Sequence, residues 1–114
     1  MGWLGGLGEE RIGRVLNAMH ADPFRRWTVQ SLAEIARMSR SIFAERFTAA
    51  VGEPPLRYLS RWRLTIAADL LRSGGLKVTE AAYRCGYASD AAFSRAFKAH
   101  FGYAPSEAKN RQLP

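Results

Sequence analysis

The chain contains one amphipathic segment twice, and this repeat limits the folds that it can adopt. The stretch RSIFAERFTAAVG carries Phe43 and Phe47, and DAAFSRAFKAHFG carries Phe93 and Phe97 at the same places 50 residues later. Apolar residues four apart lie on one face of an α-helix. The sequence therefore predicts two helices of the same design, each with one buried side.

The helix-breaking and helix-capping residues repeat as well. Three pairs lie 50 residues apart, namely Ser39 and Ser89, Gly52 and Gly102, and Pro55 and Pro105. Further upstream the offset becomes 49, with Val29 matching Val78 and Ala33 matching Ala82. Each copy then reads as a short helix, a tight turn and a longer helix, which is a helix-turn-helix unit, with the second turn one residue longer.

Strict apolar alternation is absent, so we predict an all-α fold with two helix-turn-helix subdomains, a long linker helix and about seven helices. The predicted helices are Glu9 to His20, Val29 to Ala36, Ser39 to about Ala50, Pro54 to about Arg72, Thr79 to Arg84, Ser89 to Gly102, and a short one from Pro105. The predicted divisions are an extension at 1–8, a first unit at 9–53, the linker helix at 54–73, a second unit at 74–110 and a frayed tail at 111–114.

Charge and cysteine content narrow the class of partner. The 114-residue chain has 17 Lys and Arg against 10 Asp and Glu, and 14 of those 17 are Arg. This balance favours double-stranded DNA as the partner, because Arg suits phosphate and guanine. One cysteine excludes an internal disulfide and fits a reducing cytoplasm. No apolar run approaches the roughly 20 residues of a membrane span, and we expect neither a metal nor a cofactor.

A helical wheel divides each longer helix into two faces. We expect Phe43, Phe47 and Ala50 inside in the first copy, and Phe93, Phe97 and His100 inside in the second. The outward sets are Ser41, Ala44, Glu45 and Thr48, and Ala91, Ser94, Arg95 and Lys98. Short outward side chains allow a helix to approach a groove floor, and the Arg95 guanidinium fits the O6 and N7 atoms of guanine.

The predicted linker helix has a length that suits DNA. About 19 residues span roughly 28 Å, and successive major grooves on one DNA face lie about 34 Å apart. One monomer could therefore place two recognition helices in adjacent grooves. The side of the linker helix that we expect to be buried consists of Leu56, Leu59, Trp62, Ile66 and Leu70.

The sequence offers little for two other classes of function, an enzyme and a protein-interaction module. An enzyme needs converging polar groups, and His20, His100 and Cys85 have no partner at catalytic spacing in the sequence. A protein-interaction module could instead use exposed aromatic residues, for which the candidates are Trp3, Trp27 and Tyr103.

The stretch VTEAAYRCGYASDAAFSRAFKAHFGYAP resembles the second helix-turn-helix of the AraC/XylS family of bacterial transcription regulators. Upstream, WTVQSLAEIARMSRSIFAERF and PPLRYLSRWRLTIAADLL resemble the first unit and the linker helix of that family. The resemblance implies a DNA-binding domain of seven helices that regulates promoters and can contact RNA polymerase. It also implies that the chain is the DNA-binding portion of a longer, effector-sensing regulator. The alternatives are a natural single-domain member and a helical protein-interaction module without DNA binding, and for this segment we expect a monomer.

The resemblance further implies which residues touch DNA. Base contacts would fall on Ser41, Ala44, Glu45, Asp90, Ala91, Ser94 and Arg95. Phosphate contacts are expected at Arg40, Arg46, Thr48, Lys98 and the two capping serines, Ser39 and Ser89. Three departures matter. Ala108 stands where an aromatic residue is common, so we expect the last short helix to be weakly anchored. Arg37 stands where Gly is usual and where the second copy has Gly86, and the first recognition helix has Glu45 but no outward Arg or Lys.

Overall fold

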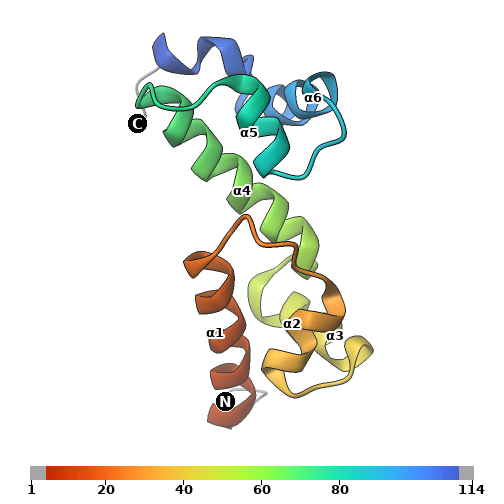
Figure 1. Ribbon diagram of the computed structural model, residues 1–114. Coiled ribbons are helices and arrows are strands. Elements are labelled where there is room, and N and C mark those ends of the chain that lie inside the picture. The colour runs from red at the N-terminus through yellow and green to blue at the C-terminus, as the bar shows by residue number, and fades with distance from the viewer. Residues whose placement is uncertain (1–4, 111–114) are drawn as a thin grey trace. The chain divides into compact units, whose positions relative to one another are not determined.

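The computed structural model describes residues 5–110, and every regular element in this range is helical. The elements are α1 (Gly5–Ala21), α2 (Val29–Ala36), α3 (Arg40–Val51), α4 (Pro55–Arg72), α5 (Val78–Arg84), α6 (Asp90–Phe101) and the 3₁₀-helix η1 (Pro105–Asn110), as Figure 1 shows. The predicted all-α fold with two helix-turn-helix units is therefore confirmed. Trp3, the first four residues and the predicted tail at 111–114 lie outside the described range.

The chain forms two compact units, Met1–Leu59 and Ser60–Pro114. In the first unit, α1, α2 and α3 pack around one core (Figure 1). Its buried members are Ile12, Val15, Met19, Trp27, Leu32, Ala33, Ala36, Phe43, Phe47 and Leu59. The residues from α1 follow the spacing i, i+3, i+7, so a single helical stripe supplies that side of the core.

One aromatic residue that we expected at the surface belongs to this core. Trp27 is only 9% exposed, and its indole N–H donates to the carbonyl oxygen of Asp22 at 2.9 Å. The expectation of an exposed Trp27 was therefore wrong. A short segment after α1 turns back on itself, which lets the ring enter the core while the N–H keeps a partner.

The second unit contains the rest of α4 with α5, α6 and η1. Its buried side chains include Leu64, Ala67, Ala68 and Leu71 from α4, Ala81 and Ala82 from α5, and Phe93 and Phe97 from α6. The predicted buried side of α4 was correct at Leu59 and wrong at Leu56, which is 41% exposed. Trp62, Ile66 and Leu70 are half-buried. In this stretch of α4 the residues that face inward are Leu64, Ala67, Ala68 and Leu71.

Candidate nucleic-acid interface

The turn between the two helices closes in the same way in both units. The N–H of Met38 donates to the carbonyl of Ala33 at 3.1 Å, and the N–H of Tyr87 donates to the carbonyl of Ala82 at 3.1 Å. Each is the six-residue hydrogen bond of a Schellman motif, which ends a helix and sets the direction of the next segment. The two bonds fall 49 residues apart, so the structure confirms the offset predicted before the turn.

The residue at the centre of each turn has a left-handed backbone. Gly86 has φ +85°, and Arg37 has φ 57° and ψ 46°. Glycine adopts this region without penalty, whereas another L-residue costs about 1–2 kcal/mol. The first turn therefore keeps the geometry of the second and stores backbone strain at Arg37.

Matching caps fix both ends of α3 and α6. The hydroxyl of Ser39 accepts a hydrogen bond from the N–H of Ile42 at 3.3 Å, and that of Ser89 accepts from the N–H of Ala92 at 3.0 Å. At the other end Gly52 and Gly102 are left-handed. Capping serines satisfy amide groups that the first helical turn leaves without a carbonyl. Both serine side chains thus have a structural role beside the phosphate contact proposed for them.

The phenylalanine pairs anchor the two helices identically. Phe43 and Phe47 are fully buried with ring centroids 5.7 Å apart, and Phe93 and Phe97 are fully buried at the same separation. Burial of one such ring stabilises a fold by about 1.5–3 kcal/mol. The opposite face of each helix is consequently held towards solvent.

Two residues that we placed on the inner faces lie outside. Ala50 and His100 are exposed. Both sit in the last turn of their helices, and the imidazole of His100 packs edge-on against Phe101 with centroids 4.6 Å apart. The inner face continues in these last turns through Val51 and Phe101, which are half-buried, so it lies one residue further along than the wheel predicted.

In the first unit, Ser41 and Glu45 are exposed and Ala44 is half-buried. The hydroxyl of Thr48 donates to the carbonyl of Ala44 at 2.7 Å. This bond occupies the only proton that Thr48 could give to a phosphate oxygen. The accessible polar atoms of this face are therefore chiefly those of Ser41 and Glu45.

In the second unit, Ala91, Arg95 and Lys98 are exposed and Ser94 is half-buried. Asp90 is exposed as well, and its carboxylate accepts a hydrogen bond from the hydroxyl of Thr79 at 2.9 Å. Sequence reasoning missed Thr79, because a contact between residues 11 positions apart across a turn leaves no local pattern. Asp90 thus also ties the start of α6 to the start of α5.

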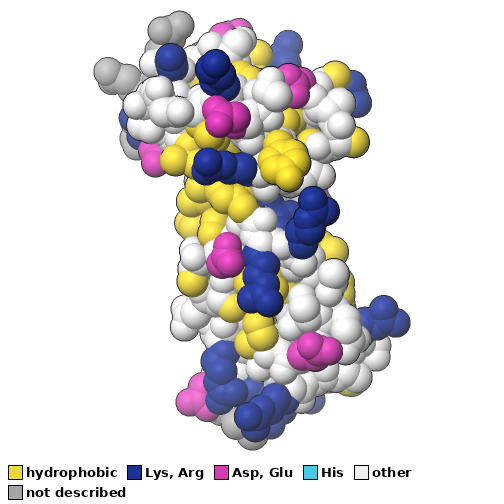
Figure 2. Space-filling model, in the orientation of Figure 1, with side chains coloured by type: hydrophobic (Ala, Val, Ile, Leu, Met, Phe, Trp, Pro, Cys, Tyr) yellow, Lys and Arg dark blue, Asp and Glu magenta, His cyan; other side chains and the backbone are white. Residues whose placement is uncertain are grey.

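Positive charge is distributed over both units. Arg40 and Arg46 both belong to the first recognition helix and are exposed. On the face drawn in Figure 2, Lys and Arg side chains occur along the molecule with Asp and Glu between them. The net charge of +7 supplies an attraction for phosphate that does not depend on base sequence.

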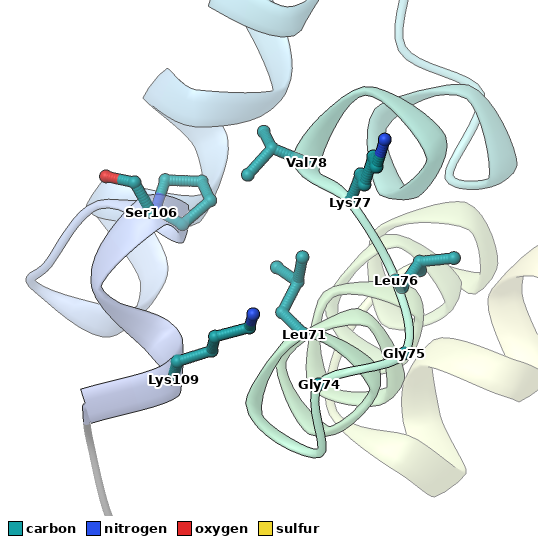
Figure 3. A pocket seen from close by; sticks show the side chains of 9 residues that line it. Leu71, Gly74, Gly75, Leu76, Lys77, Val78, Ser106 and Lys109 are labelled. Carbon is teal, nitrogen blue, oxygen red and sulfur yellow. The ribbon is translucent and has the colours of Figure 1, made fainter.

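Two hollows lie at different places on the units. One of about 530 Å³ is bordered by Val29, Arg40, Ser41 and Ala44 in the first unit. The other, about 420 Å³, lies in the second unit among the end of α4, the start of α5 and η1. In Figure 3 the Lys109 side chain extends from η1 towards Leu71. None of the residues that border this second hollow is among the predicted DNA contacts, whereas three of the four around the first are.

The titratable groups with altered pKa values lie together inside the second unit. Burial raises the pKa of the Cys85 thiol from 9.0 to about 11, and the thiol donates to the carbonyl of Arg63 at 3.7 Å. Burial also raises the pKa of Tyr87 and lowers that of Arg63. A protonated, buried thiol is a poor nucleophile. Across residues 5–110, no three His, Cys, Asp or Glu side chains gather as a metal site, and no helix in this range is long and apolar enough to span a membrane.

Comparison with known proteins identifies the family. The profile of the helix-turn-helix domain family matches residues 32–111. An AraC-like transcription regulator of Streptomyces lividans is 45% identical over 106 residues, which are 93% of this chain and 35% of that protein. The transcriptional activator RclR of Escherichia coli is 43% identical over 101 residues, 89% of this chain and 36% of that protein. The chain thus spans about a third of the length of the curated relatives that it matches.

Solved structures agree with this assignment. The DNA-binding domain of AdpA, a global transcriptional factor crystallised with a target DNA, has a TM-score of 0.79 and 30% identity, covering 88% of this chain and 90% of that one. An AraC-type regulator of Chromobacterium violaceum is 22% identical, covering 90% of this chain and 91% of that one, and its TM-score of 0.82 shows the same fold. With its two capped helix-turn-helix units, this chain belongs to the AraC-type helix-turn-helix family of transcription regulators.

Proposed function

We propose that this chain binds double-stranded DNA sequence-specifically and regulates transcription, with α3 and α6 as the two recognition helices. The observation that carries the proposal is the outward face of α6, where Arg95 and Lys98 are exposed while Phe93 and Phe97 on the other side are fully buried. A helix held in this way presents its polar side to the major groove, which admits one α-helix.

The residues expected from the sequence to contact bases and phosphates are proposed here in the same roles, with two refinements. Arg95 donates both arms of its guanidinium to one guanine, and Lys98, Arg40 and Arg46 pair with phosphates. Asp90 orients α6 through Thr79, and Thr48 contributes less than the other outward residues because its proton is already bonded.

We propose that the two recognition helices enter adjacent major grooves. The support is the length of α4, whose 18 residues span about 27 Å, compared with about 34 Å between successive grooves. The second unit contributes more of the affinity, because α6 offers an exposed Arg and Lys on its outward face and α3 offers Glu45.

We also make three wider proposals. The chain is the DNA-binding portion of a longer regulator that acts in the bacterial cytoplasm, it binds DNA as a monomer, and it can contact RNA polymerase. The match covers 35% and 37% of the length of the two Streptomyces relatives, which is consistent with the proposal that the chain is part of a longer regulator.

Selection of bound duplexes from a random library, followed by a salt titration on the selected site, tests the proposal. We expect an enriched bipartite motif with its halves about one helical turn apart. Neutralisation of about 5–8 phosphates gives a slope of about −4.5 to −7 for log K against log salt concentration. A chain that enriches no motif and shows a flat salt response does not have this function.

A further inference from the structure

Three of the four residues that border the hollow on the first unit are expected DNA contacts, and the fourth, Val29, is not. This residue is the first of α2 and is half-buried. Ala44 from α3 is also half-buried, while Ser41 and Arg40 border the hollow from the first turn of α3. The walls are therefore two short apolar side chains, and the border carries one hydroxyl and one guanidinium.

The two units differ at the starts of their helix-turn-helix helices. In the second unit the gap between the helix starts is bridged by the hydrogen bond from Thr79 to Asp90. At the matching positions the first unit has Gln30 and Arg40, and the side-chain amide of Gln30 donates to the carboxylate of Glu34 instead, at 3.2 Å. The start of α2 is therefore not tied to the start of α3 by such a bond.

The corresponding valine of the second unit has a different environment. Val78 borders the hollow among α4, α5 and η1, where Figure 3 shows it facing Leu71 across the gap. Val29 and Val78 thus occupy equivalent positions in the two repeats. Of these two valines, Val29 borders a hollow that is also lined by residues of a recognition helix, and Val78 does not. This makes Val78 a matched control.

We propose that the hollow of Val29, Arg40, Ser41 and Ala44 receives the C5-methyl group of a thymine in the operator half that α3 contacts. This inference rests on the proposed function. The thymine methyl is the one apolar group that bases present in the major groove, and small apolar side chains are its usual contacts. Val29 is then a specificity-determining residue on the helix that precedes the recognition helix.

The chemistry also accounts for the weakly charged outer face of α3. The middle of this face carries Glu45, with Arg40 and Arg46 exposed at its edges, and recognition of a methyl group there needs only shape and apolar contact. Ser41 can hydrogen-bond beside the methyl group, and Arg40 can pair with the phosphate of the same strand.

The test replaces each thymine of the selected duplex, one at a time, with deoxyuridine. This change removes the methyl group and leaves the hydrogen-bonding atoms of the base pair in place. Loss of one buried methyl group corresponds to about 0.8 kcal/mol, or about a fourfold loss of affinity. We expect one thymine to show this loss in a binding titration with the unmodified chain.

The control variants assign the effect to the hollow. Val29→Ala is expected to bind the thymine and deoxyuridine duplexes equally, while Val78→Ala retains the fourfold difference; circular dichroism checks that both are folded. No sensitive thymine, or sensitivity that persists in Val29→Ala, overturns the inference while DNA binding itself stands. A chain that binds no duplex overturns the proposed function and this inference with it.

Discussion

The hydroxyl of Thr79 lies 2.9 Å from the carboxylate of Asp90, and this hydrogen bond joins the first turn of α5 to the first turn of α6. The contact sets the position of the recognition helix relative to the helix that supports it. In the first unit the matching residues are Gln30 and Arg40, which do not form this bond. The two repeats therefore share a backbone design and differ in how the helix starts are held.

Removal of this bond is expected to weaken both stability and DNA binding. Thr79→Val keeps the shape of the side chain and removes the donor, so we expect a loss of about 0.5–1.5 kcal/mol in the free energy of unfolding. Urea denaturation measures this loss, and a duplex titration measures the accompanying fall in affinity. Thr65→Val is the matched control, because the Thr65 hydroxyl bonds only within α4, to the carbonyl of Arg61 at 3.1 Å. Equal effects of the two changes on DNA affinity would contradict a positioning role for Thr79.

The left-handed turns give opposite predictions in the two units. Arg37→Gly relieves a strained backbone and is expected to raise the free energy of unfolding by roughly 0.5–1 kcal/mol, after the greater freedom of Gly in the unfolded chain is included. Gly86→Ala is expected to lower it by about 1–2 kcal/mol. A methyl group at Gly86 would meet no atom within 4 Å, so its cost comes from the backbone alone. Urea titrations of both variants check the signs, and a destabilised Arg37→Gly would show that the arginine side chain matters more than its backbone.

Base recognition by the second unit depends most on Arg95. Arg95→Ala is expected to lose about 1–3 kcal/mol of binding free energy on the selected site and to relax the preference at one guanine. A repeat of the duplex selection with the variant shows the relaxed position. Glu45→Ala on the first helix is the comparison, and we expect it to cost less. If Arg95→Ala weakened binding to every duplex equally, the residue would be a phosphate contact.

The buried thiol predicts a pH dependence in the alkaline range. The pKa of Cys85 is about 11 in the folded chain against 9.0 for a free thiol, so the folded state holds its proton where the unfolded state has lost it. The stability linked to this thiol is fully present below about pH 9 and is lost as the pH rises to about 11. Unfolding free energies measured across this range should fall more steeply for the unmodified chain than for Cys85→Ala. Parallel curves would show that the thiol does not carry this dependence.

The sequence predicted the elements of this fold because the signals that define them act over short distances. Ser39 and Ser89 cap the next turn of chain, Gly52 and Gly102 end the helices that precede them, and the phenylalanines four apart define one helical face. These interactions span at most a few residues, so the sequence alone located α2, α3 and α6 within one residue of their observed ends. The repeat then predicted two similar units.

The tertiary structure alone decided which faces meet and which side chains bridge neighbouring helices. The core of the second unit selected the stripe of Leu64 and Leu71 on α4, left His100 outside, and brought Thr79 to Asp90. It also left a hollow beside Val29 where the other unit has a bridge. Such outcomes depend on the volumes that several helices fill together, and the spacing of residues along one helix does not contain that information.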